Sequence, residues 1–372
     1  MKIAVDIRSL SNGSMTGVGY YLYNFLKNLT ELDDEVKWQL LDSGHKKNQY
    51  PGLERKNVIL THYQMPNKII NASSYWSAKP NITSKLAKNA DLLWLPNVNF
   101  YAKRSSAVPM VLTVHDLSFL HSNTFYSWKR RLWHRLIRVK DLIEEASLIL
   151  AVSENTKRDI IRYFSVDESK IAVVNPGISY KKLTEEEARK IVKNIDLPEK
   201  YFLYVGTLEP RKNLQAVIQA FDRIHSEYPQ YNLVVVGGKG WLYKPLLQAI
   251  KKRSYIKYLG YQKSPIKDAL YRLAYAFVWP SFYEGFGFPP LEALAHKKPI
   301  ITSYKTSLPE TLLNNALYVD PYNVTDLYVS MKHLIEDQHL YLSLISDTVY
   351  LPEWREQSQN ILELFRKIIE QK

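Results

Sequence analysis

The sequence has no cysteine among its 372 residues. Disulfide bonds and thiolate metal sites are therefore excluded, and a reducing compartment is the expected environment. No apolar run approaches the roughly 18 residues that a membrane-spanning helix needs. Asp6 and Arg8 interrupt the apolar start, which is typical of a first strand and not of a signal peptide. We expect a cytoplasmic protein, and the alternative is a peripheral protein at the inner face of the plasma membrane.

The charge of the chain is one-sided. Lysine and arginine number 50 against 37 aspartates and glutamates, which gives a formal net charge of +13. Such a balance indicates an anionic partner: nucleic acid, anionic lipid or a phosphorylated substrate. The basic residues alternate with acids in both halves, and no nucleic-acid recognition module is present. We therefore expect no nucleic-acid partner.

Short apolar runs alternate with amphipathic stretches, a pattern typical of parallel sheets with crossover helices. In the first half the predicted strands cover 2–8, 36–42, 91–96, 109–116, 148–153 and 171–177. A second cycle begins with a strand at 201 and continues with strands at 256–261, 276–281 and 299–303. We predict an α/β fold with two doubly wound, Rossmann-like domains and a cleft between them.

Proline and glycine break the pattern near 175–183, which sets the domain boundary. The predicted domains are 1–178 and 179–350, followed by an amphipathic helix within 351–372. In doubly wound sheets, ligands bind at the carboxyl ends of the strands. Most of the unusual motifs of this sequence lie at those ends.

Arg211 and Lys212 stand together after a strand, where a helix begins. The dipole of a helix N-terminus repels cations, so a basic pair there indicates a bound anion. A guanidinium and an ammonium together suit a phosphate or diphosphate. The alternative is a pair of solvated basic residues on a loop.

Two glycines, Gly17 and Gly19, lie between the first predicted strand and a predicted helix at 19–29. Their spacing is similar to a shortened glycine loop that brings backbone close to a diphosphate or a sugar. A flexible loop without ligand is the alternative.

His115 and Asp116 lie at the end of an apolar strand. The histidine could hold a hydroxyl or move a proton, and the aspartate could act as a base. In the structural alternative, Asp116 caps the next helix beside a half-buried histidine.

Glu284 and Glu292 flank a stretch crowded with glycine and proline. The glycines allow the torsions of a tight loop, and Pro289 and Pro290 fit the start of a helix with Glu292 in its first turn. Carboxylates beside a diphosphate would be repelled, so we expect them to accept hydrogen bonds from hydroxyls: Glu284 from a sugar and Glu292 from a ribose. Otherwise Glu284 is a turn residue and Glu292 a partner of the helix dipole.

The segment 128–140 carries six lysines and arginines and no acid. At helical spacing, apolar residues form one face and basic residues another, which is typical of helices that lie on anionic membranes. The predicted membrane-facing residues are Trp128, Lys129, Arg131, Arg135 and Arg138. The alternative is a solvated basic face over a core contact.

These motifs together resemble retaining glycosyltransferases of family 4, which have the GT-B fold. "YEGFGFPPLEAL" (283–294) has the Glu-x7-Glu element of that family, and "GTLEPRKNL", "VVVGGKGW" and "SLPE" are similar to its other carboxyl-terminal motifs. "GVGYYLYNFL" and "TVHDL" look like its amino-terminal half. The resemblance implies an acceptor-side domain, then a donor domain, then a closing helix that returns to the first.

The resemblance also implies roles for single residues. Arg211 and Lys212 would bind the donor diphosphate, with Gly17, Gly19 and Leu291 also at the nucleotide. Glu292 would bind the ribose. The donor sugar would be held by His115, Glu284, Gly285, Phe286 and Gly287, and the catalytic set would be Glu284, His115, Asp116, Arg211 and Lys212.

The implied reaction is transfer of a hexose, with retention, from a nucleotide-sugar to a hydroxyl of a glycan or lipid-linked acceptor. The chain resembles bacterial mannosyltransferases of polysaccharide and lipopolysaccharide assembly, so GDP-mannose is the predicted donor and a UDP-sugar (glucose or N-acetylglucosamine) the alternative. No Asp-x-Asp pair suggests a bridging metal, so we expect neither metal nor cofactor. A glycoside hydrolase using the two glutamates is a competing hypothesis.

Overall fold

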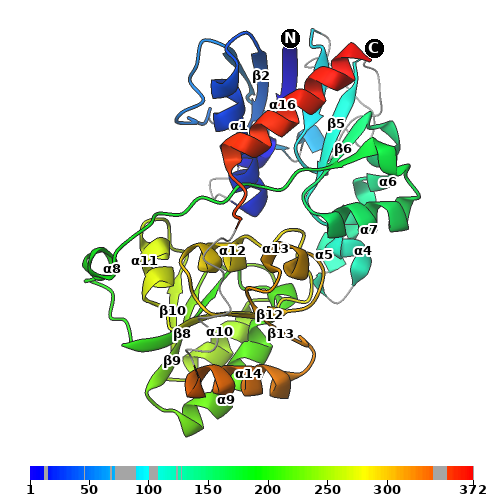
Figure 1. Ribbon diagram of the computed structural model, residues 1–372. Coiled ribbons are helices and arrows are strands. Elements are labelled where there is room, and N and C mark those ends of the chain that lie inside the picture. The colour runs from blue at the N-terminus through cyan, green and yellow to red at the C-terminus, as the bar shows by residue number, and fades with distance from the viewer. Residues whose placement is uncertain are drawn as a thin grey trace. The chain divides into compact units, whose positions relative to one another are not determined.

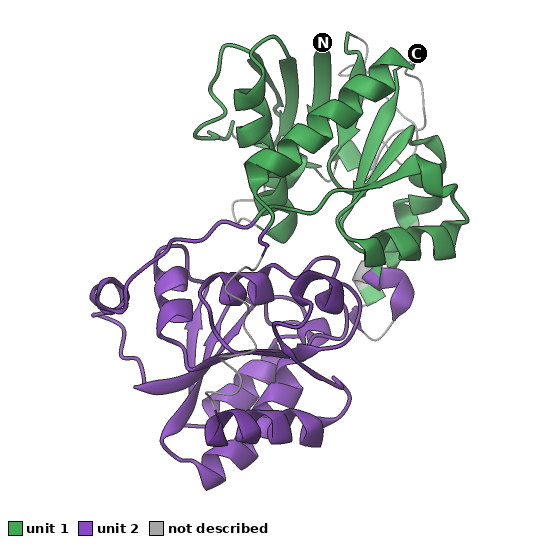
Figure 2. Cartoon of the chain, viewed as in Figure 1, with its two compact units in different colours: residues 1–117, 128–177, 352–372 green, residues 118–127, 178–351 purple. Residues whose placement is uncertain are grey.

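The computed structural model describes residues 1–11, 16–45, 47–67, 69–71, 89–99, 108–122, 125–126, 128–337 and 350–371. The chain forms two compact units (Figure 2). Unit 1 comprises Met1–Leu117, Trp128–Gly177 and Pro352–Lys372, and unit 2 comprises Ser118–Ser127 and Ile178–Leu351. The segment 118–127 thus groups with unit 2, although the sequence analysis placed it in the first domain.

Unit 1 is built on a seven-stranded parallel sheet with the order β3-β2-β1-β4-β5-β6-β7. Its strands are β1 (Lys2–Asp6), β2 (Lys37–Ser43), β3 (Val58–Tyr63), β4 (Leu92–Leu95), β5 (Met110–Val114), β6 (Leu148–Ala151) and β7 (Ile171–Val173). The edge strand β3 was not predicted. Its side chains are only half-buried or exposed, so it lacks the apolar run that marks a central parallel strand.

The described helices of unit 1 are α1 (Gly17–Leu32), α5 (Trp128–Leu136), α6 (Val139–Glu145), α7 (Glu154–Phe164) and α16 (Trp354–Glu370), with short 3-10 turns at Arg8–Leu10 and Glu168–Lys170. Helix α16, drawn in red, lies beside α1 (Figure 1). The Trp354 ring meets the edge of Phe25 at a centroid distance of 5.0 Å, and Arg366 forms an ion pair with Asp33 at 2.6 Å. The predicted return of the closing helix to the first domain is confirmed.

Unit 2 is built on a six-stranded parallel sheet with the order β10-β9-β8-β11-β12-β13. Its strands are β8 (Lys200–Val205), β9 (Tyr231–Val236), β10 (Ile256–Gly260), β11 (Ala276–Trp279), β12 (Ile300–Ser303) and β13 (Leu317–Val319). The central strands β8 and β11 are adjacent, and β11 is fully buried. The carboxyl ends of these two strands carry the residues of greatest interest.

The described helices of unit 2 are α4 (Ser118–His121), α8 (Glu185–Ile191), α9 (Leu214–Glu227), α10 (Lys244–Lys251), α11 (Ile266–Leu273), α12 (Phe288–Ala295), α13 (Leu308–Leu312) and α14 (Val324–Glu336), with a 3-10 turn, η4, at Pro210–Lys212. Two parallel sheets with crossover helices confirm the predicted doubly wound architecture. Within the described ranges, no helix combines the length and the hydropathy that crossing a membrane requires.

Candidate functional site

Arg211 and Lys212 lie in η4, separated from the end of β8 by four residues, and α9 begins two residues later at Leu214. Between them and the helix, Asn213 adopts a left-handed conformation with φ of 57°. Its side-chain amide donates to the carbonyls of Pro280, at 3.0 Å, and Pro321, at 2.7 Å. These two bonds tie the turn to the ends of β11 and β13, so the position of the basic pair is fixed by the sheet.

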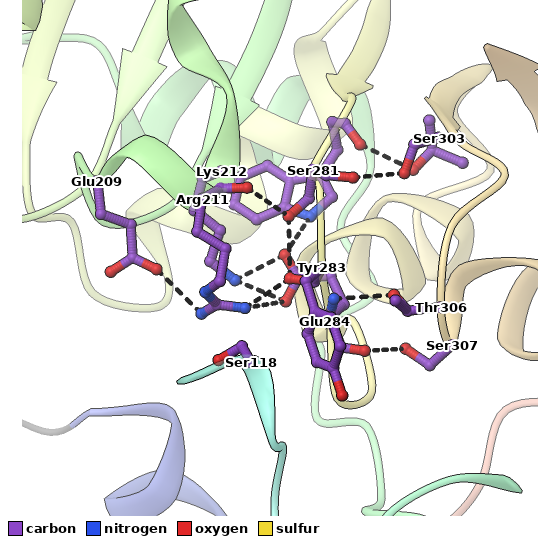
Figure 3. Close-up of polar contacts among 12 residues, drawn as sticks. Ser118, Glu209, Arg211, Lys212, Ser281, Tyr283, Glu284, Ser303, Thr306 and Ser307 are labelled. Atoms are coloured by element: carbon purple, nitrogen blue, oxygen red, sulfur yellow. Dashed lines mark hydrogen bonds and ion pairs between the residues drawn. The ribbon is translucent and has the colours of Figure 1, made fainter. Parts of the chain in front are cut away.

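Glu284 lies in the loop after β11, and its carboxylate faces the basic pair. The Lys212 Nζ is 2.6 Å from Oε1 and 2.6 Å from Oε2, and the Arg211 Nη1 is 3.5 Å from Oε2 (Figure 3). Arg211 also donates from Nη1 to the Tyr283 carbonyl at 2.6 Å, and its Nη2 forms an ion pair with Glu209 Oε1 at 2.9 Å. Two acids and two bases thus form one buried cluster, which we call the η4–Glu284 cluster: Glu209, Arg211, Lys212 and Glu284.

The electrostatics of this cluster keep Glu284 ionised. Burial alone would raise its pKa, but Lys212 and Arg211 outweigh burial, so the pKa of Glu284 is lowered. For Lys212, burial and the neighbouring Arg211 lower the pKa, and Glu284 opposes them. The formal charges of the four side chains sum to zero, which is how a group of ions this buried is tolerated.

The loop that carries Glu284 is held from both sides. Ser281 donates from Oγ to the Arg211 carbonyl at 3.1 Å, and the Glu284 amide donates to Thr306 Oγ1 at 2.9 Å. Ser307 donates from Oγ to the Glu284 carbonyl at 3.0 Å. Figure 3 shows these bonds on both sides of the loop. Glu284 is therefore an anchored residue and not a free turn residue.

Of the two glycines in this loop, only Gly287 has the positive φ expected of a tight loop, at 96°. A β-carbon there would also lie 2.9 Å from a methyl group of Leu308. The side chains of Phe286 and Leu291 are buried at 5% and 1% exposure. Any contact of these two residues with a ligand therefore falls to their backbone, and their roles stay predictions, as does that of Gly285.

Glu292 occupies a different position from the one expected. Helix α12 begins at Phe288, before the two prolines, so Glu292 lies in its second turn and not in its first. A partnership with the helix dipole is therefore not its explanation, because that effect fades after the first turn. Glu292 is 6% exposed, and its carboxylate accepts from Lys267 Nζ of α11 at 2.5 Å. Sequence reasoning missed Lys267, Glu209, Thr306 and Trp279; only Glu209, two residues from Arg211, had a signal in the motif.

In unit 1, His115 follows β5. Its Nε2 lies 2.8 Å from the Pro96 carbonyl, which can only accept, so Nε2 carries the proton. Burial lowers the pKa of His115 against the opposing effects of Pro96 and Asp116. The imidazole is therefore neutral near pH 7, and its Nδ1 is a hydrogen-bond acceptor. Asp116, beside it, is half-buried.

The expectation of a glycine loop at Gly17 and Gly19 is wrong. Both residues belong to the first turn of α1, because Thr16 caps the helix: its Oγ1 accepts from the Gly19 amide at 3.2 Å. Neither glycine has a positive φ. Any diphosphate contact would therefore come from amides of a helix N-terminus.

The expectation of one basic helix over 128–140 is also wrong. Helix α5 ends at Leu136, Arg138 turns left-handed with φ of 56° and pairs with Asp141, and α6 begins at Val139. The apolar residues of this segment do not share one face, because Val139 is buried whereas Trp128 is 64% exposed. Arg131 and Arg138 are exposed, and the side chains of Lys129 and Arg135 lie outside the described part of the chain.

No group of three or more histidine, aspartate or glutamate side chains with a metal-binding arrangement occurs among the residues that the structure describes. The positive charges of the η4–Glu284 cluster are those of the Arg211 and Lys212 side chains.

Comparison with known proteins gives the family. Residues 15–182 match the family described as Glycosyltransferase Family 4, and residues 185–348 match Glycosyl transferases group 1. An O-antigen chain mannosyltransferase B of Escherichia coli is 28% identical over 338 residues, covering 87% of this chain and 88% of its own. The O-antigen chain mannosyltransferase RfbU of Salmonella typhimurium is 30% identical over 217 residues, covering 56% of each chain.

Solved structures agree on the fold. HepE of Anabaena, in complex with UDP and glucose, superposes with a TM-score of 0.74 at 19% identity, covering 98% of this chain and 99% of its own. A sucrose-phosphate synthase of Thermosynechococcus elongatus superposes with a TM-score of 0.77 at 17% identity, covering 100% of both chains. The fold is GT-B. The chain belongs to glycosyltransferase family 4, a family of retaining hexosyltransferases that use nucleotide-sugar donors.

Proposed function

We propose that this chain transfers mannose, with retention of configuration, from GDP-mannose to a hydroxyl of a glycan or lipid-linked glycan in surface-polysaccharide assembly. The names of the two O-antigen mannosyltransferases support the choice of sugar and pathway class. A UDP-sugar is the alternative donor, and the structural neighbour HepE was solved with UDP and glucose.

The observation that carries the proposal is the η4–Glu284 cluster. It joins two cations and a carboxylate at the carboxyl ends of β8 and β11, where a doubly wound sheet binds its ligands. A departing nucleoside diphosphate develops negative charge, and Arg211 and Lys212 are suited to stabilise it. A carboxylate held between them is suited to accept from sugar hydroxyls.

In the proposed step, the acceptor oxygen attacks the anomeric carbon on the face from which the diphosphate departs. The bond from that carbon to the phosphate oxygen breaks as the new glycosidic bond forms. The departing phosphate oxygen takes the proton of the acceptor hydroxyl, so no protein nucleophile and no separate base are required. The leaving group ends as a nucleoside diphosphate paired with the two cations.

Further roles are proposed for single residues. Glu284, with the backbone of 285–287, binds hydroxyls of the donor sugar, and Glu292 binds the ribose from the donor domain. His115 Nδ1 is suited to accept from a sugar hydroxyl because the ring is neutral. Asp116 and the first-turn amides at Gly17 and Gly19 are candidates for further hydrogen bonds from the acceptor-side domain.

A panel of nucleotide-sugars tests the proposal. A donor that binds only the folded protein raises its melting temperature. At a donor concentration of one hundred times the Kd, the free energy of unfolding increases by about 2.7 kcal/mol. We expect GDP-mannose to stabilise the protein more than UDP-glucose or UDP-N-acetylglucosamine, and to release GDP in the presence of acceptor glycan. A preference for a UDP-sugar would make that nucleotide-sugar the donor in place of GDP-mannose. Sugar release from a glycan without any nucleotide would instead favour a hydrolase.

We also propose that α5 lies on an anionic membrane surface. Trp128, Leu132 and Trp133 are exposed at 64%, 48% and 39%, beside the exposed Arg131. Exposed tryptophan next to arginine suits the boundary between headgroups and acyl chains.

Sedimentation with phosphatidylglycerol vesicles should show binding that salt weakens and that the double variant Trp128→Ser, Leu132→Ser abolishes. Ile59→Ser is the control, because it removes from β3 an apolar side chain whose exposure, 52%, lies between those of Trp128 and Leu132. Binding that salt does not affect would contradict the proposal.

A further inference from the structure

The carboxylate of Glu284 has a donor that is not a cation. The Trp279 indole Nε1 lies 3.0 Å from Glu284 Oε1, and both residues are buried. The Lys212 ammonium contacts both oxygens, the Arg211 guanidinium contacts Oε2, and the Ser281 hydroxyl also stabilises the ionised carboxylate. Neutral and charged donors therefore share this carboxylate, and the Trp279 N–H is the neutral donor with a defined partner oxygen.

The donors differ in how firmly they are held. Trp279 ends β11 and is 0% exposed, and its ring packs against Tyr204 at 4.9 Å and Phe277 at 6.1 Å between centroids. A β-carbon at Gly206, on the neighbouring strand end, would overlap the indole. The Trp279 carbonyl accepts from Thr302 Oγ1 at 2.8 Å. The direction of the indole N–H is thus set by the core of the sheet.

The two cations reach the carboxylate through long side chains, although Arg211 is also held by the Tyr283 carbonyl and by Glu209. The side chains of Lys212 and Arg211 keep 13% and 11% of their surface exposed, and both are long chains with several rotatable bonds. The Lys212 Nζ also lies 5.2 Å from the centre of the Trp279 ring, which offers it an attractive surface in more than one position. If Lys212 and Arg211 turn to a diphosphate, the carboxylate loses its charged donors.

We propose that Trp279 is a positioning residue for Glu284: its N–H holds Oε1, so that the carboxylate keeps its orientation toward the donor sugar while the two cations bind the diphosphate. The inference rests on the proposed function for the identity of that ligand. The hydrogen bond itself does not depend on it.

Indole NMR signals test the hydrogen bond without any substrate. The sequence holds eight tryptophans, so protein labelled with ¹⁵N-tryptophan gives eight indole signals. Trp279→Phe removes one signal and assigns it. That signal should move upfield in Glu284→Gln, because a neutral amide is a weaker acceptor than a carboxylate. An unmoved signal would overturn the proposal whether or not the chain is a glycosyltransferase.

Adding GDP or UDP tests the positioning role. We expect the Trp279 signal to stay downfield in the nucleotide complex, because the bond to Glu284 persists when the cations turn away. A shift to the position seen in Glu284→Gln would mean that the carboxylate leaves Trp279, which overturns the proposal. If no indole signal responds to either nucleotide and no nucleotide-sugar is turned over, the proposed function fails, and the positioning role during transfer fails with it. The Glu284→Gln experiment still shows whether the hydrogen bond between Trp279 and Glu284 exists.

Kinetics complete the test. Trp279→Phe keeps an aromatic ring and removes the donor, and loss of a hydrogen bond to a charged group should lower kcat/KM roughly 10- to 100-fold. Trp94→Phe is the matched control: Trp94 in unit 1 is also 0% exposed and donates from Nε1 to Thr113 Oγ1 at 3.0 Å. It should lower the melting temperature comparably and leave kcat/KM within about 3-fold. Equal losses of kcat/KM in the two variants would reduce Trp279 to a core residue and overturn the proposal.

Discussion

The ammonium of Lys212 lies 2.6 Å from each carboxylate oxygen of Glu284, although 72 residues separate the two along the chain. Both side chains are almost fully enclosed, with 13% and 6% of their surfaces exposed. Each therefore depends on the other for charge compensation, and the predictions begin from that dependence.

Lys212→Met should destabilise the protein by roughly 3 kcal/mol, because it leaves Glu284 buried with only the more distant Arg211 as a counter-charge. The double variant Lys212→Met, Glu284→Gln should recover more than half of that loss. Urea unfolding, followed with a probe in unit 2, measures both. If the losses of the two single variants simply add, the pair is not coupled.

Arg211→Ala should lower kcat by about 10²–10³, the usual cost of removing one fixed donor that stabilises a developing anion. Glu284→Ala should lower kcat by a similar factor, because it removes the acceptor proposed for the hydroxyls of the donor sugar. Arg189→Ala is the control, since Arg189 pairs only with the exposed Glu185 on α8 among the contacts the structure describes. Near-normal turnover in both Arg211→Ala and Glu284→Ala, with circular dichroism unchanged, would refute the site.

Gly206→Ala should displace the indole of Trp279, because the added methyl group has no room. We expect a loss of about 1–3 kcal/mol in stability and a drop in kcat/KM like that of Trp279→Phe. Gly238→Ala, two residues past β9, has open space at its β position and should lose neither. The melting temperatures and kcat/KM values of the two variants test this prediction. Equal values for Gly206→Ala and Gly238→Ala would mean that the indole of Trp279 can move to make room for the methyl group.

Lys298, after α12, provides a test by pH. Burial, followed by the charge of Arg272, lowers its pKa from 10.5 to about 8. The charged form is therefore penalised in the folded state below pH 8, and the penalty disappears as the pH rises from 8 toward 10.5. Lys298→Met should be more stable than the parent at pH 7 by at most roughly 3 kcal/mol, and this advantage should shrink by pH 10. An advantage that does not change with pH would come from packing alone.

The sequence predicted the parts of the fold that depend on strong apolar periodicity. The buried central strands β8 and β11 were found because they are continuous apolar runs between breakers. Because the two strands are adjacent, the motifs that follow them bring Arg211, Lys212 and Glu284 together. The half-buried edge strand β3 has no such run and was missed.

The errors came from local capping and torsion. Thr16 starts α1 earlier than the glycines suggested, and Phe288 starts α12 earlier than the prolines suggested. The left-handed Arg138 divides α5 from α6, and nothing in a basic amphipathic pattern marks a single residue of that conformation. The indole bond of Trp279 to Glu284 joins residues five apart through a bend, a relation that periodicity does not report.

Helix α16 gives the chain an order of assembly. Its Ile361 and Phe365 are 0% exposed, and Phe365 packs on Trp94 of β4 within unit 1. Unit 1 therefore combines residues before 178 with the segment 352–372, whereas most of unit 2 lies between them in the sequence. Segments fold on the ribosome in the order in which they emerge. Unit 1 is therefore begun first and completed last, and a ribosome that stalls before residue 354 leaves the surface that α16 covers exposed to water.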